Sequence, residues 1–304
     1  MNEVNKSTIA NAEFEPIIAK PQISKLEQLF ASVFGDSKEV VAVLRLNGVI
    51  GKVSTVKSGL TLESLNELIE KAFKIKKLKA LCLIINSSGG SPVQSELIAK
   101  RIRTLAKEHK IKIYSFIEDM AASGGYWLAC AGDQIYALHS SIIGSIGVVS
   151  SGFGFHEAIN KLGIERRVYT EGKNKAVLDP FKPINKEDVK IIKDLQKQVY
   201  EHFVDYVKTR RVGKLTQQDD ILFNGEFWAG RTALDYGLID DLGDMYSTMK
   251  AKFGNNIKFQ YLCAKQPWIK RKLGMASKIL TDNFADSLIN AVENKIINDK
   301  FDIK

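Results

Sequence analysis

At 304 residues, with 45% hydrophobic and 26% charged residues, the chain has the composition of a globular protein with a sizeable core. The formal net charge of +9 comes from lysines spread along the chain, with no stripe of arginines and interleaved aromatics, which argues against a nucleic-acid partner. The three cysteines show no C-x-x-C spacing, which excludes a disulfide scaffold and is typical of a reducing compartment.

The beginning of the sequence carries no recognisable targeting signal. Its first twenty residues contain three glutamates and no apolar h-region, so a secretory signal is not expected. The longest apolar candidate for a membrane span, residues 142–155, is too short and is interrupted by serines. These features predict a soluble, cytoplasmic protein.

Apolar runs alternate with amphipathic segments through the first half of the chain. Residues 22–35 carry apolar side chains at helical spacing and end at Gly35. Four short apolar runs that favour strands then alternate with segments of helical spacing. The predicted strands are 40–46, 80–85, 111–117 and 134–138, and the predicted helices include 61–73 and 96–106. This alternation predicts an α/β fold with a mostly parallel sheet.

The second half of the chain begins less regularly. Residues 165–170 favour a strand that enters a turn. Residues 185–209 have the apolar spacing of a long amphipathic helix, and residues 229–236 that of a short one ended by Gly237.

A basic tail follows Cys263. The amphipathic spacing of residues 277–297 predicts a helix that packs on a surface or a partner, and peripheral contact with a membrane is the alternative. The chain is therefore divided into an N-terminal extension with an amphipathic helix (1–38), an α/β domain (39–262) and a basic helical tail (263–304).

Residues 118–132 are the stretch around which the predicted sheet is organised. The strand at 111–117 ends in two acids, small residues surround Ser123, and two glycines precede an apolar stretch with helical character. A serine at such a strand-to-helix turn exposes its hydroxyl, and N–H groups at the helix N-terminus can stabilise an oxyanion. Ser123 is therefore a candidate nucleophile, and a serine that only caps the helix is the alternative.

Other glycine-rich and histidine-containing segments do not match cofactor or metal sites. Residues 139–155 contain no G-x-G-x-x-G, and no Gly-Lys pair in the chain is followed by Ser or Thr as a phosphate loop requires. His156 and Glu157 begin like a zinc-protease motif, but Asn160 stands where the second histidine would be. No cofactor and no metal are expected.

A serine nucleophile needs a base, and the four histidines are scattered without a motif that would supply one. A neutral lysine can serve where an apolar site disfavours the ammonium form. Two backbone N–H groups are also required for the oxyanion, one after the nucleophile and one from a neighbouring glycine turn. Ser123, Ser145, the Gly89-Gly90 turn and a lysine near position 175 are candidates for such a site.

Five sequence blocks resemble the bacterial signal peptide peptidase family, the protease IV and SohB group of Ser–Lys peptidases with a ClpP/crotonase-type fold. The blocks are Asn86-Ser-Ser-Gly-Gly-Ser, Asp119-Met-Ala-Ala-Ser-Gly-Gly-Tyr-Trp, Gly144-Ser-Ile-Gly-Val-Val, Gly172-Lys-Asn-Lys and Phe227-Trp-Ala-Gly-Arg-Thr-Ala-Leu-Asp-Tyr-Gly-Leu-Ile-Asp. They follow the family's order over residues 40–245. Ser88 departs from the family's usual Asn-Ser-Pro-Gly-Gly, although both glycines are kept. The resemblance implies repeated ββα units with a mostly parallel sheet, flanked by the terminal amphipathic helices.

The resemblance also implies roles for individual residues. Ser123 would be the nucleophile and Lys175 the general base. Ser145 would orient the lysine amine, and the N–H groups of Gly90 and Gly124 would form the oxyanion hole. For Ser145, a turn serine bonded to local backbone is an equal alternative.

The base is assigned to Lys175 and not to Lys173. The family lysine lies three residues after the glycine that matches Gly172 and five before the proline that matches Pro180. Lys173 is interpreted as a surface residue.

The implied activity is that of a serine endopeptidase that cleaves peptides, or unfolded or membrane-derived segments, through a Ser–Lys dyad and an acyl-enzyme. The peptide is expected to bind in an extended form at a strand edge. Family members assemble into rings or domes, and in some the serine and the lysine come from neighbouring subunits, so a homo-oligomer is expected. The alternatives are a crotonase-like acyl-CoA enzyme, which needs the oxyanion hole but not the dyad, and a catalytically inactive peptide-binding scaffold.

Overall fold

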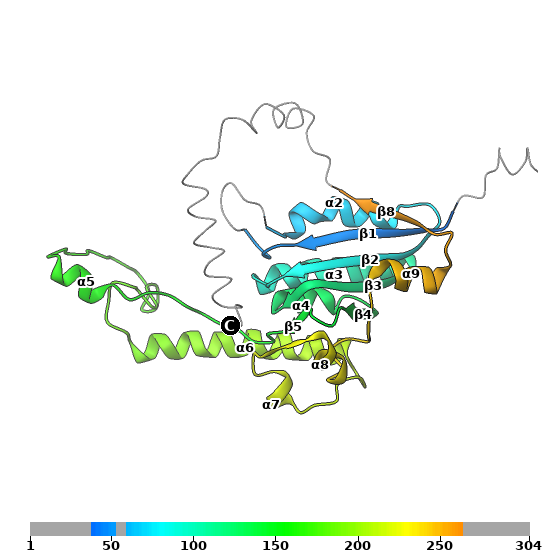
Figure 1. The fold of residues 1–304 in the computed structure, drawn as a ribbon. Coiled ribbons are helices and arrows are strands. Elements are labelled where there is room, and N and C mark those ends of the chain that lie inside the picture. The colour runs from blue at the N-terminus through cyan, green and yellow to red at the C-terminus, as the bar shows by residue number, and fades with distance from the viewer. Residues whose placement is uncertain (1–37, 53–58, 264–304) are drawn as a thin grey trace, which may run out of the picture.

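The structure is a computed structural model that describes residues 38–52 and 59–263 (Figure 1). The strands of this part of the chain are β1 (Val40–Asn47), β2 (Leu78–Ser87), β3 (Lys112–Ala122), β4 (Gln134–Ala137), β5 (Ile142–Gly144), β6 (Phe227–Ala229), β7 (Asp241–Leu242) and β8 (Lys258–Leu262). The helices are α2 (Leu62–Phe73), α3 (Pro92–His109), α4 (Gly124–Ala129), α5 (His156–Lys161), α6 (Lys186–Arg210), α7 (Asp219–Leu222), α8 (Gly230–Asp235) and α9 (Met245–Phe253).

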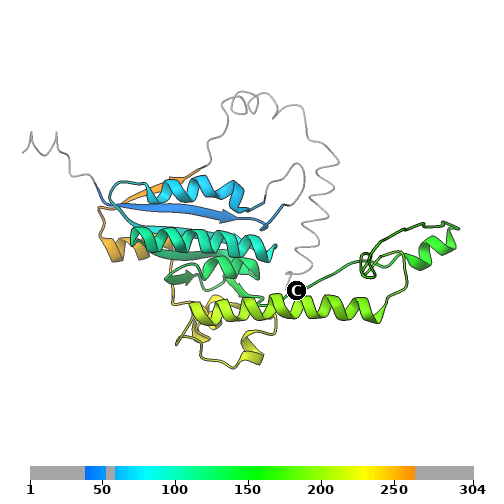
Figure 2. The same ribbon diagram turned by 180° about the vertical axis from the view of Figure 1, so that it is seen from behind.

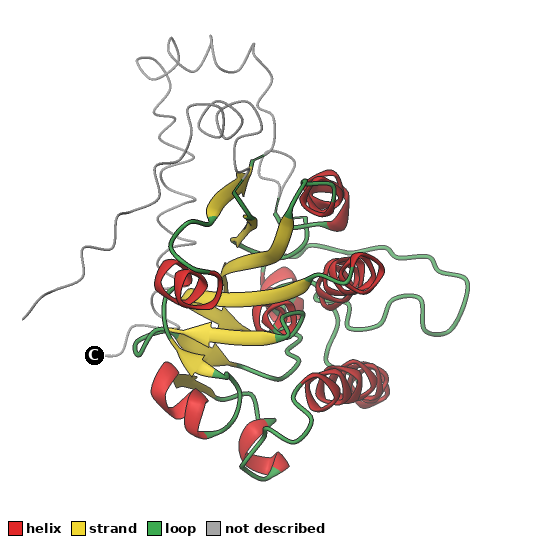
Figure 3. Cartoon of the chain, turned by 90° about the vertical axis from the view of Figure 1, so that its right-hand side faces the viewer, coloured by secondary structure: helices red, strands yellow, loops and turns green. Residues whose placement is uncertain are grey.

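One sheet organises these elements. Its strands follow the order β6-β5-β3-β2-β1-β8, and β4 pairs with both β3 and β7. All of these pairs are parallel except β5 with β6. Seen from the side in Figure 3, the strands form a central layer with helices on both faces. The predicted α/β class with a mostly parallel sheet is confirmed.

The continuous apolar runs of β1 and β2 exist because both faces of these strands are buried. In β1, Ala42, Leu44 and Leu46 belong to the larger hydrophobic core. Val41 and Val43 point to the other face of the sheet and belong to a second core. This second core also contains Met245 and Met249, both of which lie in α9. A strand with one solvated face would instead have shown alternation of polar and apolar residues.

Local sequence signals start the two helices that cover the larger core. Thr61 is the N-cap of α2, and its side chain and that of Ser64 form a reciprocal capping box. Ser91 caps α3, whose first residue is Pro92, a position where the missing N–H costs nothing. The predicted start of α2 is confirmed, whereas α3 begins four residues before the predicted range of 96–106.

The parallel arrangement brings the carboxyl ends of neighbouring strands to the same edge of the sheet. The Gly89-Gly90 turn follows β2, and Ser123 follows the adjacent β3. Open α/β sheets bind their ligands at this edge.

Residues 149–185, here called the arm, project from the body of the molecule together with the first half of α6 (Figures 1 and 2). Only the second half of α6 is anchored in the core, through Phe203, Val204 and Val207. The predicted strand at 165–170 is wrong, since this segment forms no strand and every residue from 161 to 170 is exposed. Its apolar residues favour extended backbone, but no neighbouring strand is there to pair with it.

The predicted amphipathic helices at 22–35 and 277–297 lie outside the described residues, as do most of the N-terminal extension and the basic tail. Among the helices of the described part, none has the length and apolar character needed to cross a membrane.

Candidate active site

Ser123 occupies a strained turn between β3 and α4. Its φ of 51° lies in the left-handed region, which is rarely adopted by residues with a side chain. The main chain holds it there, because its N–H donates to the Gly144 carbonyl at 2.8 Å and its carbonyl accepts from the Tyr126 N–H at 3.0 Å. The hydroxyl makes no capping hydrogen bond to α4, so Ser123 is not a helix-capping serine in this structure.

Two glycine N–H groups lie beside this turn. A Cβ built on Gly89 would come within 2.9 Å of the Ser123 Cβ, so only glycine allows this close approach. A Cβ built on Gly124 would lie 3.5 Å from the Gly90 nitrogen, which makes the backbones of Gly90 and Gly124 neighbours. The Gly89-Gly90 turn is held to Ile50 by two backbone hydrogen bonds of 2.8 Å. The Ile50 N–H donates to the Gly89 carbonyl and the Ser91 N–H donates to the Ile50 carbonyl, so the Gly90 N–H is not used in this contact.

Ser145 directly follows β5, the strand that pairs with the end of β3 just before Ser123. Ala122 and Gly144 pair in the parallel ladder of β3 and β5, and each serine comes one residue later. Ser145 also has a left-handed φ, of 52°, and its N–H donates to the Glu226 carbonyl at 2.6 Å. The turn that follows β5 is thus anchored on the segment before β6.

A small hollow of about 20 Å³ opens beside Ser123. Its wall includes both Gly90 and Gly124, so the structure brings together the candidate nucleophile and the two candidate oxyanion donors. Val199 and Phe203 of α6 also line it, and neither was singled out from the sequence as a site residue. Their apolar spacing predicted a packing face of α6, but a contact across 76 and 80 positions of sequence gives no local signal.

Aromatic stacking attaches α6 to the helix that follows Ser123. Trp127 of α4 is only 2% exposed, and it stacks on Phe203 and Tyr206 with ring centroids 4.8 and 4.9 Å apart. Trp127 also lines the hollow, so it both packs α4 against α6 and shapes the site.

A polar network supports α4 from behind. The Tyr126 hydroxyl donates to the Leu238 carbonyl at 2.7 Å, and burial raises the pKa of Tyr126 well above its usual value, so it remains a neutral donor. Burial likewise raises the pKa of the Cys130 thiol to about 11, which leaves it unreactive at neutral pH. Arg211 is buried nearby and donates to the Gly237 carbonyl and to Asp240.

Lys175 lies in the arm and not beside its own Ser123. It is exposed, and its N–H donates to the Gly172 carbonyl at 3.1 Å in a turn of the arm. The nearby Leu178 N–H donates to Asp188 in the first turn of α6, and about 16 Å of helix, at about 1.5 Å per residue, separates Asp188 from Val199 in the hollow. Figures 1 and 2 show the arm at the far end of α6 from the sheet.

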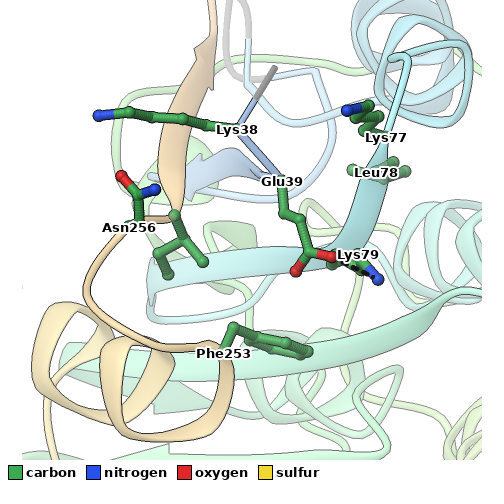
Figure 4. A pocket seen from close by; sticks show the side chains of 8 residues that line it. Lys38, Glu39, Lys77, Leu78, Lys79, Phe253 and Asn256 are labelled. Carbon is green, nitrogen blue, oxygen red and sulfur yellow. Dashed lines mark ion pairs between the residues drawn. The ribbon is translucent and has the colours of Figure 1, made fainter. Parts of the chain in front are cut away.

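A larger hollow, of about 680 Å³, lies at the amino ends of β1 and β2 (Figure 4). It is lined by Lys38, Glu39, Lys79 and Phe253 among others, and Lys79 pairs with Glu39 at 2.7 Å. None of the candidate site residues borders it, and the parallel strands separate it from Ser123.

Comparison with protein families identifies the domain that carries this site. Residues 105–253 match the model of peptidase family S49. The chain contains a peptidase family S49 domain. Ser123, Ser145 and Lys175 lie inside the matched range of the S49 domain, whereas Gly90 precedes it. The family recognised from the five sequence blocks is thereby confirmed.

Two of the relatives are longer proteins. The chain is 45% identical over 281 residues to a protein of Brucella melitensis biotype 1 named Na(+)/H(+) antiporter NhaA, covering 90% of this chain and 38% of that protein. It is 32% identical over 206 residues to Protease 4 of Haemophilus influenzae, covering 67% of this chain and 32% of that protein. The chain thus spans about a third of the length of each.

Among solved structures, a mutant of the 1510-N membrane-bound stomatin-specific protease is similar to the chain with a TM-score of 0.47 and 15% sequence identity. The similarity covers 75% of this chain and 100% of that one.

Proposed function

We propose that the chain is a serine endopeptidase that acts on peptides or unfolded segments through Ser123 and Lys175, in the manner of signal peptide peptidases. The observation that carries the proposal is the hollow in which the strained Ser123 turn meets the backbones of Gly90 and Gly124. A nucleophile needs oxyanion donors placed before the reaction begins, and these two N–H groups belong to rigid turns. Membership of the S49 domain in a peptidase family supports the same activity.

In the proposed mechanism, the Ser123 Oγ attacks the carbonyl carbon of the scissile peptide bond while its proton passes to the neutral Lys175 Nζ. The N–H groups of Gly90 and Gly124 bind the oxyanion of the tetrahedral intermediate. The lysine ammonium then gives its proton to the leaving amine, and the serine ester remains. A water molecule, deprotonated by the same amine, hydrolyses this ester and restores Ser123.

We propose further that Lys175 reaches Ser123 from a neighbouring copy of the chain. The length of α6 between the arm and the hollow supports this arrangement, because the helix holds the Lys175 turn away from the Ser123 of its own chain. A lysine acts as a base in its neutral form, which water disfavours and an apolar enclosure favours. On a single copy, the Lys175 side chain is exposed to water. Docking of the arm on a second copy would supply the enclosure.

The exposed apolar side chains of the arm support the proposal that it docks on another protein surface. Phe153, Tyr169 and Ile184 are 81, 90 and 82% exposed, and Leu195 on the projecting half of α6 is 56% exposed. Large apolar side chains gathered on one projecting element are typical of a protein interface. A homo-oligomer in which each arm covers the next copy would bury them and complete each site.

The hollow beside Ser123 indicates the kind of side chain that the substrate presents. At about 20 Å³ it has room for a group of about the size of a methyl or a water molecule. Its walls of Trp127, Val199 and Phe203 are apolar. We propose that the peptide binds extended, with a small apolar residue such as alanine next to the scissile bond.

Covalent labelling tests the dyad. A fluorophosphonate probe is expected to label the wild-type chain at Ser123, to fail on Ser123→Ala, and to react at least about 100-fold more slowly on Lys175→Ala, because general bases contribute about 10²–10⁴ to such rates. Lys173→Ala is the matched control, since Lys173 lies in the same turn and pairs with Glu187 on the surface. Labelling that persists in Ser123→Ala, or that depends on Lys173 and not on Lys175, would contradict the assignment.

Substrate assays separate the proposal from its alternatives. Cleavage of casein that is lost in Lys175→Ala, with the fold and the assembly unchanged, excludes a peptide-binding scaffold. Turnover of an acyl-CoA thioester that is unaffected by Ser123→Ala would instead favour a crotonase-like enzyme, which uses an oxyanion hole without the dyad.

A further inference from the structure

The turn that carries Lys175 is fastened by an ion pair inside the arm. Arg166 forms a salt bridge with Asp179, four residues after Lys175, and its guanidinium lies over the ring of Phe181 at 4.7 Å. The Asp179 side chain is only 4% exposed, although most of its neighbours in the arm are open to solvent. This makes the pair unlike the other ion pairs of the arm.

Asp179 also organises the main chain around it. Its Oδ1 accepts the Phe181 N–H at 3.0 Å, its carbonyl accepts the Lys182 N–H at 3.1 Å, and its Oδ2 is buried without a hydrogen-bond partner. The Phe181 N–H first, and the guanidinium of Arg166 in addition, hold the pKa of Asp179 below its usual value. Arg166 is thus the cation that pairs directly with a carboxylate covered by its own turn.

Two further contacts tie this turn to the rest of the arm and to α6. The Phe155 N–H donates to the Pro180 carbonyl at 2.5 Å, and the rings of Phe155 and Phe181 lie 5.7 Å apart. On the other side, the Leu178 N–H donates to Asp188 of α6 at 3.0 Å. No residue of α5 is buried, so the ion pair and these contacts take the place of a hydrophobic core in the arm.

We infer that Arg166 and Asp179 are positioning residues for Lys175: they fix the lysine turn in one shape before it meets the neighbouring Ser123. The inference rests on the proposed function, in which Lys175 is the base. A base that must enter a second copy cannot be shaped by its own active site, so its geometry has to be set within the arm. Neither residue touches substrate in this scheme, and their effect passes through Lys175.

The first test is steady-state cleavage of a peptide with alanine before the scissile bond. Arg166→Ala and Asp179→Asn are expected to lower kcat about 10- to 100-fold with KM changed less than threefold, because misplacing a catalytic group by about 1 Å can cost about 100-fold. Arg166→Lys, which keeps the charge, should recover part of the loss. Arg167→Ala is the matched control, since the adjacent Arg167 pairs with Glu165 on the surface at 2.8 Å, with both side chains about 70% exposed. It should retain wild-type activity.

The second test locates the effect on the chain that donates the lysine. Co-assembly of Ser123→Ala chains with Lys175→Ala chains leaves only sites built from the lysine of the first and the serine of the second. Adding Arg166→Ala to the Ser123→Ala chain should abolish most of the restored activity. Adding it to the Lys175→Ala chain should leave that activity unchanged.

The outcomes separate this inference from the proposed function. Wild-type rates in Arg166→Ala and Asp179→Asn, or an equal loss in both co-assembly arrangements, would overturn the positioning role while leaving the dyad intact. Loss of assembly by size-exclusion chromatography in both variants and in Arg166→Lys would also overturn it, since the pair would then only stabilise the arm. Fluorophosphonate labelling that persists in Ser123→Ala and is not slowed in Lys175→Ala, with Arg166 and Asp179 unchanged in both variants, would refute the proposed function itself.

Discussion

Val199 forms part of the α6 wall of the hollow beside Ser123, and its size is expected to limit the substrate side chain accepted there. The hollow of about 20 Å³ holds little more than a methyl group. Val199→Ala removes two methyl groups from this wall without touching Ser123, Gly90 or Gly124. The variant should therefore accept a valine side chain where the wild type accepts alanine.

The magnitude follows from the apolar area gained. Each methylene transferred from water into an apolar pocket is worth about 0.8 kcal/mol, so two further carbons contribute up to about 1.6 kcal/mol. Because about 1.36 kcal/mol corresponds to a factor of ten in rate, the ratio of kcat/KM for valine over alanine substrates should rise by up to about 15-fold. If the enlarged hollow of Val199→Ala also binds the alanine substrate less well, the ratio rises further.

The assay compares kcat/KM for two peptides that differ only in the residue before the scissile bond. Val204→Ala is the control, because Val204 lies on the same helix and is buried in the core but does not border the hollow. It should lower stability and leave the ratio unchanged. An unchanged ratio in Val199→Ala, or an equal shift in Val204→Ala, would refute the assignment of the hollow as the side-chain pocket.

Three further predictions concern the turns and the network around the site. Gly90→Ala would place a methyl group 2.1 Å from the Ile50 carbonyl oxygen and so displace the Gly90 N–H. Fluorophosphonate labelling of Ser123 should therefore slow by at least about 100-fold. Gly152→Ala is the control, because a methyl group there meets open space, and it should behave as wild type. Arg211→Met should lower the free energy of unfolding in urea by about 1–3 kcal/mol, because the mostly buried carboxylate of Asp240 loses one of its two cationic partners and keeps only Lys214. Burial opposes ionisation of Asp240, but hydrogen bonds from Arg211 and Lys214 outweigh it and hold its pKa below the usual value. Its contribution to stability is therefore complete above the unfolded pKa of about 3.9 and is lost as pH falls through the lower folded pKa, so Asp240→Asn should flatten this acid limb in urea unfolding followed against pH.

Most of the sheet and the turn that contains Ser123 could be predicted from the sequence, because these features depend on local patterns. The strands β1 and β2 are continuous apolar runs, and the Thr61 and Pro92 signals mark where α2 and α3 begin. Ser123 stood out because small residues and glycines surround it at a strand end. Each of these features is encoded within a dozen neighbouring positions.

The course of the arm and the residues that line the hollow could not be predicted from local sequence patterns. Residues 165–170 have the composition of a strand, but strand formation needs a pairing partner, and the described part of the chain places no strand beside the projecting arm. Val199 and Phe203 looked like core positions of an amphipathic helix, and only the tertiary fold sets them beside Ser123. The position of Lys175 relative to Ser123 depends on the direction of a whole helix, which periodicity does not encode.

In the proposed assembly, the helix α6 would link substrate selection in its own chain to delivery of the base to the next copy. Its second half stacks on Trp127 and closes the hollow of its own chain, while its first turn binds the Leu178 N–H of the lysine arm through Asp188. The 25 residues of α6 span about 37 Å, and we expect a change of tilt at the stacked end to shift the far end as well. In the proposed assembly, that shift falls on the base offered to the next copy. Replacement of Trp127 should therefore reduce the rate at neighbouring sites even when the altered chain supplies only the lysine, which is measurable in the same co-assembled pairs of Ser123→Ala and Lys175→Ala chains.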